Sequence, residues 1–553
     1  MLRVDFNFVT NVNNAIKSAK FEKENSAQQN PSFKAVKHNK VMMMIYDGFG
    51  IAPKLTKNNP FKDANMPIYK GLKANINGDT LFRSIEAAGV HVGLPAGMVG
   101  SSEVGHNNLG AGRLVPQDLM MIDNALNDGS FYSNKTILEA MEKARQTGKT
   151  VHVMGLLSDG GVHSETRHLN AIIKMAHDLG VNDIKVHAFL DGRDVKEGSG
   201  IEYVRDTNQV LAENGFSEIA SIMGMTLPMD RAKNWEKTSD AFDLLTHGRN
   251  YPEVTDVYAE LKRQYHNGVE DRNIMPRKTT SYKPISDGDT VIFFNYRPDR
   301  AIQITDALTQ ENCVAPFLNG KRQPQNLNFV CMSQYKPEFH LPVAFAPEMH
   351  RNTLTQIMSE NLYRPFICTE TEKQAHLTFF FDGKRHINFD GVSSVFLASE
   401  KKFTPPMRLA QIKEYLKLAL KDNTTKFILT NFANPDMVGH NGTYEDAVKA
   451  LEYVDKATGE LLKLARKLGV AVVGTCDHGN IEDMSQGGHT NNPVHLFTVL
   501  PGMEKEIANK EIRFTNDQTM ALKDVAPTVL DIVGVKKPYD MSGESVLDRK
   551  KIY

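Results

Sequence analysis

Short runs of apolar and β-branched residues recur along the chain, and most of them are followed at once by Asp, Asn or Gly. Continuous apolar runs of this length are typical of strands that are covered on both faces of a sheet. The predicted strands are Val41–Tyr46, Val151–Leu157, Val186–Leu190, Val291–Phe294, Leu377–Phe381, Phe427–Thr430 and Val470–Val473.

Helical patterns with charged faces separate these runs. They cover Thr166–Leu179, Gly200–Asn214, Pro406–Lys421 and Tyr444–Leu468. The alternation of strand and helix predicts an α/β protein with mostly parallel sheets. Ligands bind such sheets where the strands end, and the polar clusters of this chain directly follow its apolar runs.

Two segments are predicted to cross between domains. They are Leu114–Asp123 and Leu341–Arg351, the second of which contains Pro342 and Pro347. The crossings indicate that the middle of the chain is inserted into a domain built from both ends. We therefore expect one domain made of residues 41–116 and 347–553 and an inserted domain of residues 117–346.

Residues 1–40 are rich in Asn, Ser, Gln and Lys and show no periodicity. This composition predicts a flexible N-terminal tail. A transit peptide is the alternative, and it is less favoured because Asp5, Glu22 and Glu24 are acids that such peptides usually lack.

The composition excludes several classes of protein. The chain has 65 basic and 66 acidic residues, so no overall field attracts nucleic acid or an anionic membrane. The four cysteines show no paired spacing, which speaks against a disulfide framework or a thiolate zinc site and favours a reducing cytosol. No apolar run approaches the roughly 20 residues of a membrane span. We expect a cytoplasmic monomer that acts on a small molecule.

Carboxylates and imidazoles follow several of the predicted strands. A single Asp after a strand, as Asp47 is after Val41–Tyr46, is most often a turn residue. Here the arrangement recurs near the far end of the chain, where Asp477 and His478 follow Val470–Val473.

Asp436 and His440 lie between these two places in the chain. They are four residues apart, either on one helical face or around a tight loop. The candidate metal ligands are Asp47, Asp436, His440, Asp477, His478 and His489.

This oxygen and nitrogen set suits Mn²⁺, Mg²⁺ or Zn²⁺ and does not suit a structural zinc knot. A single divalent ion would seldom bind all six of these side chains. Two divalent ions would outweigh the three carboxylates and leave a positive site, matched to a phosphoryl dianion and to a serine alkoxide. The ligand set therefore favours phosphoryl chemistry over redox chemistry.

Ser102 is the candidate nucleophile. It lies in a glycine-rich stretch, Gly97 to Arg113, and glycine lets backbone and metal approach a side chain closely. A serine that opens a helix can use the helix dipole to bind phosphate, although its hydroxyl needs a base or a metal to become nucleophilic. Alone it is more often a helix cap, but the following Glu-Val-Gly-His makes the signal far more specific.

Arginines follow apolar strands in the middle of the chain: Arg193, Arg231, Arg297 and Arg300. Arginine forms bidentate bonds to carboxylate and phosphate, and a phosphorylated hydroxy acid carries both groups. These arginines predict a substrate clamp. The alternative is a set of ordinary surface pairs between arginine and aspartate.

Three motifs carry a family resemblance: Ser-Ser-Glu-Val-Gly-His-Asn-Asn-Leu-Gly-Ala-Gly-Arg from residue 101, Asn-Pro-Asp-Met-Val-Gly-His from residue 434, and Asp-His-Gly-Asn from residue 477 with His-Thr-Asn-Asn-Pro-Val from residue 489. They closely resemble the signatures of cofactor-independent phosphoglycerate mutase, a branch of the alkaline phosphatase superfamily. The likeness runs from about Val41 to the C-terminus.

The resemblance implies an alkaline-phosphatase-like, metal-binding domain formed by both chain ends and an inserted α/β domain that binds substrate. It also implies interconversion of 3-phosphoglycerate and 2-phosphoglycerate through a phosphoserine at Ser102. Mn²⁺ is the expected metal, with Mg²⁺, Co²⁺ and Zn²⁺ as alternatives, and no 2,3-bisphosphoglycerate is required. The implied ligands of one metal are Asp436, His440 and His489, and those of the other are Asp47, Ser102, Asp477 and His478.

The resemblance assigns further roles by position. Asp194 corresponds to the general acid and base at the glycerate hydroxyl, and Lys373 to the lysine that stabilises the transferring phosphoryl group. The implied substrate-binding residues are His163, Arg193, Asp194, Arg231, Arg297, Arg300 and Lys373.

One position departs from the family pattern. Family members usually carry an arginine where this chain has Met225. A lost charged hydrogen bond is worth roughly 1.5 to 3 kcal/mol, so either another cation substitutes or substrate affinity or identity has shifted. Met225 thus favours one rival, a metal-dependent phosphohydrolase or another phosphomutase of the superfamily. A binding protein without turnover is the second rival, and the complete set of seven metal-site residues speaks against it.

Overall fold

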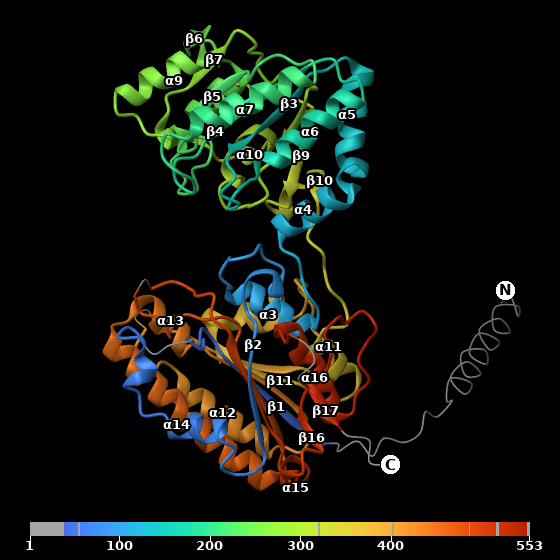
Figure 1. Ribbon diagram of the computed structural model, residues 1–553. Coiled ribbons are helices and arrows are strands. Elements are labelled where there is room, and N and C mark those ends of the chain that lie inside the picture. The colour runs from blue at the N-terminus through green and yellow to red at the C-terminus, as the bar shows by residue number, and fades with distance from the viewer. Residues whose placement is uncertain are drawn as a thin grey trace, which may run out of the picture.

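A computed structural model describes residues 38–52, 56–318, 321–400, 403–485, 487–515 and 519–549. These residues form two lobes joined by two chain crossings (Figure 1). The mixed α/β fold with mostly parallel sheets is confirmed. The tail expected over residues 1–40 lies outside the described residues, apart from residues 38–40.

The first lobe is built on a seven-stranded sheet in the order β12-β11-β13-β1-β14-β15-β2. Its strands are β1 (Val41–Tyr46), β2 (Thr80–Ile85), β11 (Phe366–Glu370), β12 (Ser393–Leu397), β13 (Phe427–Phe432), β14 (Ala471–Thr475) and β15 (Val494–Val499). The pairs that β15 forms with β14 and β2 are antiparallel, and the other pairs are parallel. Every residue of the central strand β1 is buried, as its continuous apolar sequence requires. Opposite ends of the chain therefore meet in one sheet.

Helices cover this sheet on both faces (Figure 1). The α-helices are α2 (Pro67–Lys73), α3 (Ser102–Ala111), α11 (Leu354–Glu360), α12 (Leu409–Lys421), α13 (Asn434–Asn441), α14 (Tyr444–Leu468), α15 (Glu504–Ala508) and α16 (Val525–Val533). Short 3₁₀ turns are η1 (Pro60–Lys62), η2 (Gly89–Val92), η7 (Thr371–Lys373) and η9 (Leu522–Asp524). The strands β16 (Ile512–Phe514) and β17 (Leu547–Arg549) form a separate antiparallel pair. The long helix α14 begins at a capping box between Thr443 and Asp446 and ends at Gly469, whose φ is 65°.

The second lobe is built on an eight-stranded sheet in the order β10-β9-β8-β3-β4-β5-β7-β6. Its strands are β3 (Val151–Leu157), β4 (Ile184–Leu190), β5 (Ser221–Gly224), β6 (Glu253–Val254), β7 (Arg277–Thr279), β8 (Thr290–Phe293), β9 (Asn328–Ser333) and β10 (Val343–Phe345). The helices are α4 (Asp118–Asp128), α5 (Lys135–Thr147), α6 (Thr166–Asp178), α7 (Gly200–Glu213), α8 (Trp235–Thr246), α9 (Val257–His266) and α10 (Ile302–Thr309), with turns η3 (Ser130–Ser133), η4 (Asp271–Asn273), η5 (Pro316–Leu318) and η6 (Pro337–Phe339). All strands of this sheet come from the middle of the chain.

One predicted strand is wrong. The run Leu377–Phe381 lies in a π-helix, η8 (His376–Phe380), and not in a strand. Leu377 and Phe381, four residues apart, are fully buried, which is helical spacing. The turn packs on α3 so closely that a Cβ on Gly110 would lie 1.9 Å from the carbonyl oxygen of Phe381. Packing against the helix that carries Ser102 therefore determines the conformation of this run.

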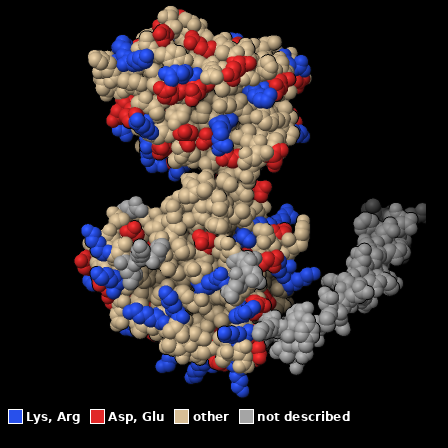
Figure 2. Space-filling model, in the orientation of Figure 1, with Lys and Arg blue, Asp and Glu red and all other residues tan. Residues whose placement is uncertain are grey.

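Both expected crossings contain regular structure at the end that joins the second lobe. Helix α4 begins at Asp118, within the first segment, and β10 occupies Val343–Phe345, within the second. Among the described residues, no helix combines the length and apolar character that crossing a membrane would need. On the face drawn in Figure 2, acidic and basic side chains are interspersed over both lobes, in keeping with the balanced charge.

Candidate functional site

Three neighbouring parallel strands deliver the candidate metal ligands to one edge of the first sheet. Asp47 follows β1, Asp436 lies in the first turn of α13 just after β13, and Asp477 follows β14. Because β1 pairs with both β13 and β14 in parallel, the carboxyl ends of the three strands lie side by side. The close approach depends on Gly48, which has a φ of 69° and where a Cβ would lie 2.8 Å from the Cα of Asp436.

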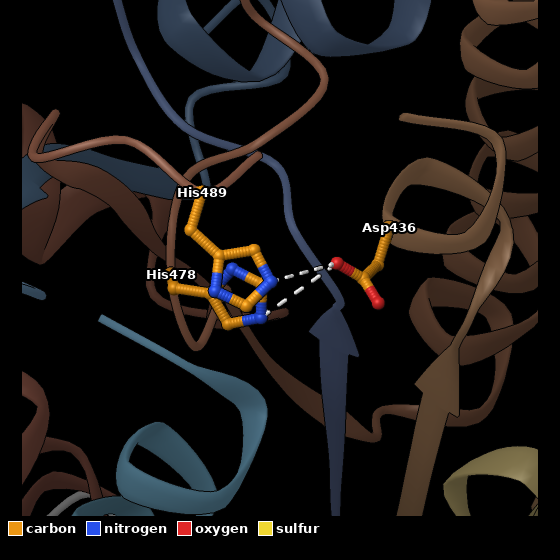
Figure 3. Close-up of side chains that lie close together, drawn as sticks. All are labelled: Asp436, His478 and His489. Atoms are coloured by element: carbon orange, nitrogen blue, oxygen red, sulfur yellow. Dashed lines mark ion pairs between the residues drawn. The ribbon is translucent and has the colours of Figure 1, made fainter. Parts of the chain in front are cut away.

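One group of ligand atoms surrounds Oδ1 of Asp436. This oxygen lies 3.2 Å from Nε2 of His440, 3.6 Å from Nε2 of His489 and 3.8 Å from Nε2 of His478. Figure 3 shows the imidazoles of His478 and His489 directed together at the Asp436 carboxylate. Asp436 and His440 lie on one helix, α13, and not around a tight loop.

A second group lies deeper. Nε2 of His478 is 3.6 Å from Oδ1 of Asp47 and 3.4 Å from Oδ2 of Asp477, and all three side chains are fully buried. Ser102 joins them, with Oγ 3.1 Å from Oδ1 of Asp47 and 2.9 Å from Nε2 of His478. The seven residues named by the resemblance as metal ligands therefore lie together, and His478 reaches both groups.

The donor set fits two divalent cations. Nδ1 of His440 donates to the Gly487 carbonyl and Nδ1 of His489 donates to the Gly100 carbonyl, each over 2.8 Å. The two Nε2 atoms, 3.0 Å apart, are thereby left to bind a shared cation.

Oδ2 of Asp477 is buried and accepts no hydrogen bond, although the imidazoles of His106 and His478 lie 3.1 and 3.4 Å from it. Three buried carboxylates face one buried ammonium, that of Lys373, and the imidazole of His478, where burial lowers the pKa but the carboxylates outweigh it and raise that pKa to about 9. Cations would compensate the negative charge that remains.

Lys373 occupies the space between the two groups and the serine. Its Nζ lies 2.7 Å from Oδ1 of Asp47, 2.7 Å from Oδ2 of Asp436 and 2.9 Å from Oγ of Ser102. Burial lowers the pKa of Lys373, but the Asp47 and Asp436 carboxylates outweigh it and raise that pKa above its ordinary value. The ammonium is therefore a permanent positive charge beside the serine hydroxyl.

Ser102 opens helix α3 and is 7% exposed. The preceding residue, Ser101, is the N-cap and accepts a hydrogen bond from the Val104 amide. Ser102 thus lies at the positive end of a ten-residue helix, where the dipole favours a phosphate ester. Gly105 permits this position, because a Cβ there would lie 2.4 Å from the Asp477 carbonyl oxygen.

Sequence reasoning gave no role to three residues that hold the ligands in place. His106 lies with Nδ1 3.1 Å from Oδ2 of Asp477, and Asn431 donates a hydrogen bond of 2.6 Å to Oδ2 of Asp47. Glu482 is fully buried and accepts hydrogen bonds from the Gly50 and Asn480 amides. His106 could have been found from its position four residues after Ser102 on a helix. Glu482 has no comparable signal.

Apart from Lys373, which lies among the metal-site residues of the first lobe, the predicted substrate residues lie in the second lobe, after β3, β4, β5 and β8. Asp299, which the sequence did not indicate, organises them. It lies 3.2 Å from Nε of Arg297, 2.5 Å from Nη1 of Arg231 and 3.6 Å from Nδ1 of His163. The side chains of Arg231 and Arg297 are about half exposed, at 51% and 50%, so they remain accessible to an anion.

Asp194 and Arg193 complete this group. Oδ1 of Asp191 accepts hydrogen bonds of 3.0 Å from the amides of both residues and so fixes the turn. Oδ2 of Asp194 is buried, accepts no hydrogen bond and lies 3.9 Å from Nε2 of His163. Burial and the neighbouring Asp191 raise the pKa of Asp194 against the opposing effect of Arg193. The structure thus brings together the clamp residues in one lobe and the metal-site residues in the other.

Comparisons with known proteins agree with this division. Residues 122–337 match the family described as BPG-independent PGAM N-terminus, and residues 349–530 match Type I phosphodiesterase / nucleotide pyrophosphatase. The fold and the site define a metal-dependent enzyme of the alkaline phosphatase superfamily.

Relatives and a solved structure give the family. The chain is 38% identical over 524 residues to the 2,3-bisphosphoglycerate-independent phosphoglycerate mutase of Thermomicrobium roseum, covering 92% of this chain and 98% of that protein. It is 37% identical over 523 residues to the enzyme of the same name from Listeria monocytogenes serotype 4b, covering 92% and 99%. The crystal structure of Leishmania mexicana phosphoglycerate mutase at low cobalt concentration matches with a TM-score of 0.63 and 28% identity, over 94% of this chain and 99% of that one. The chain belongs to the 2,3-bisphosphoglycerate-independent phosphoglycerate mutases, which are isomerases.

Proposed function

We propose that this chain interconverts 3-phosphoglycerate and 2-phosphoglycerate by transferring the phosphoryl group to Ser102 and back. One observation carries the proposal. The buried hydroxyl of Ser102 lies within 3.1 Å of Asp47, His478 and Lys373 at the N-terminus of a helix. The candidate nucleophile, Oγ of Ser102, thus lies beside a cationic group and at the positive end of a helix dipole.

The first half of the reaction takes place at Ser102. Its Oγ attacks phosphorus, as the alkoxide, in line with the departing oxygen of the substrate. The bond from Oγ to phosphorus forms as the bond to the C3 oxygen breaks, and Asp194, initially protonated, gives its proton to that oxygen. Lys373 keeps a positive charge beside the equatorial oxygens. Two divalent cations held by the two ligand groups would lower the pKa of the hydroxyl and neutralise charge on the phosphoryl group.

The second half needs a proton acceptor at the other hydroxyl of glycerate. Asp194 fits this role because its Oδ2 is buried and free of hydrogen bonds, and because burial raises its pKa. It removes the proton of the 2-hydroxyl, that oxygen attacks the phosphoserine, and the bond from Oγ to phosphorus breaks. In the meantime the glycerate is held by the clamp residues His163, Arg193, Arg231, Arg297 and Arg300.

The two sets of residues must meet for this sequence. They lie in different lobes, so we propose that the crossings Leu114–Asp123 and Leu341–Arg351 act as hinges that close the lobes on the substrate. Closure would also exclude water, which would otherwise hydrolyse the phosphoserine. The domain boundaries at residues 116/117 and 346/347 belong to this proposal.

Mn²⁺ is the proposed metal because the sites offer hard carboxylate oxygens and imidazole nitrogens without thiolates. We further propose a cytoplasmic monomer that needs no 2,3-bisphosphoglycerate. The test is conversion of 3-phosphoglycerate by the purified chain with Mn²⁺ and without 2,3-bisphosphoglycerate, read by both 2-phosphoglycerate and free phosphate. Isomerised product without free phosphate is expected. Free phosphate as the main product would overturn the proposal in favour of a phosphohydrolase.

A further inference from the structure

A pocket of about 250 Å³ lies beside the clamp residues of the second lobe. Two of them, Arg193 and Arg300, line it together with Met225, Thr226, Arg272 and Asn273. Three guanidinium groups and no carboxylate are therefore found among the described residues of its wall. A pocket of this composition is suited to a carboxylate or a phosphate.

Met225 brings no charge to this wall. It is 3% exposed and packs in an apolar cluster with Phe189, Met223 and Met229. Its backbone is also fixed, because its amide donates to the Leu190 carbonyl and its carbonyl accepts from the Met229 amide. The cationic side chain that the family pattern places at this position is thus replaced by part of the core.

Arg272 reaches the pocket from a different element, the turn η4. The backbone of this turn is held against the end of β5, since the amide of Thr226 donates to the Arg272 carbonyl over 3.1 Å. Gly224 allows the contact, because a Cβ there would lie 2.3 Å from that carbonyl oxygen. Asp271 anchors the other side of the turn by accepting from the Gly200 amide. These contacts on both sides of η4 therefore hold the backbone of Arg272 beside the pocket.

The side chain of Arg272 remains available. Its partner is Glu270, at 2.7 Å, and the two side chains are 46% and 44% exposed. Exposed pairs of this kind are weak, so an incoming anion can compete for the guanidinium. Arg300 lies among other arginines at the same pocket: burial and then the nearby Arg193 and Arg231 lower its pKa against the opposing effects of Asp299 and Asp194.

We propose that Arg272 binds an anionic group of the substrate and supplies the cation that Met225 does not. The proposal rests on the proposed function, since the anion is that of phosphoglycerate. It also answers the question raised by the sequence: another cation substitutes, and the substrate is retained. Arg272 comes from η4 and not from the loop after β5, so the charge is restored by a different element that lines the same pocket.

The test compares steady-state kinetics of the full chain with those of Arg272→Gln, Arg272→Lys and a matched control. Arg205→Gln is the control, because Arg205 also pairs with a nearby exposed glutamate, Glu202, on the same lobe. Arg272→Gln should raise KM for 3-phosphoglycerate about 10- to 150-fold, the loss of one charged hydrogen bond, with little change in kcat. Arg272→Lys should recover part of the loss, and Arg205→Gln should match the wild type.

A KM for Arg272→Gln within twofold of the wild type would overturn the proposal while leaving the proposed function intact. A wild-type chain without mutase activity would instead overturn the proposed function. In that case calorimetric titration with 3-phosphoglycerate decides about Arg272 by itself. Weaker binding by Arg272→Gln than by Arg205→Gln would support the role in anion binding, and equal dissociation constants would refute it.

Discussion

Nζ of Lys373 lies 2.9 Å from Oγ of Ser102, although 271 residues separate them in the chain. The same ammonium contacts Asp47 and Asp436, one from each ligand group. Lys373 is therefore placed to stabilise charge at the serine and to balance the carboxylates at the same time. Its removal should affect the reaction more than the fold.

Lys373→Met should lower kcat about 100- to 1,000-fold, the range found when one preorganised donor to a transferring group is removed. Metal content, measured by mass spectrometry of the purified protein, should stay near that of the wild type. Lys417→Met is the control, since this lysine pairs with Glu414 and Glu460 on the surface of α12. A kcat for Lys373→Met within a few-fold of the wild type would contradict the role of the ammonium.

Ser102→Ala should abolish phosphoryl transfer while metal binding stays largely intact. The direct measurement is acid quenching after addition of labelled 3-phosphoglycerate, which should leave label on the wild-type protein and none on the variant. Ser101→Ala is the matched control, because it removes only the N-cap of α3 and should cost about 0.5 to 2 kcal/mol of stability. Mutase activity in pure Ser102→Ala would refute the assignment.

Asp194→Asn should slow formation of 2-phosphoglycerate more than it slows labelling of Ser102, because the amide cannot accept the proton of the 2-hydroxyl. Rapid-quench measurements of both steps test the difference. Asp159→Asn serves as control, since that carboxylate bonds to Tyr203 on the surface. Equal losses in the two steps would speak against a proton shuttle.

The sequence predicted the sheets and the ligand set because both rest on local signals. Continuous apolar runs gave β1, β13 and β14, and the residues after them include the candidate ligands Asp47, Asp436 and Asp477. The run Leu377–Phe381 carried the same signal but folds as a π-helix, because contact with α3 overrides its propensity.

The residues that sequence reasoning missed act through contacts that only the fold creates. Glu482 holds the amides of Gly50 and Asn480, and Asp299 joins arginines that lie far apart in the chain. A buried acceptor of backbone hydrogen bonds has no sequence pattern of its own. Arg272 belongs to the same class, since its proximity to Met225 depends on η4 packing against β5.

Metal removal should destabilise the first lobe as well as abolish activity. Without cations, the three buried carboxylates of Asp47, Asp436 and Asp477 would face only two positive groups among the described residues. These are Lys373 and His478, where burial lowers the pKa of the imidazole but the carboxylates outweigh it and raise that pKa to about 9. Dialysis against a chelator should lower the unfolding midpoint, and added Mn²⁺ should restore it. Mn²⁺ at 100 times its dissociation constant would contribute about 2.7 kcal/mol. An unchanged midpoint after verified metal loss would contradict the two ligand groups as metal sites.

Asp382 gives a prediction about pH. It follows η8, is 4% exposed, and burial raises its pKa to about 7 against the opposing effects of Thr355 and Arg385. A carboxyl whose folded pKa exceeds its ordinary value of 3.8 stabilises the fold only while it is protonated. Its contribution is complete below pH 3.8, falls as the pH rises and is lost above about pH 7.

Asp382→Asn keeps the shape of the neutral carboxyl and removes its ionisation. Relative to the wild type, the variant should therefore gain stability as the pH rises from about 4 to 7, by about 4 kcal/mol at most. Denaturant unfolding at closely spaced pH values measures the difference. The exposed Asp390→Asn is the control and should keep the wild-type slope. A parallel pH dependence for wild type and Asp382→Asn would show that the pKa of this carboxyl is not raised in the folded protein.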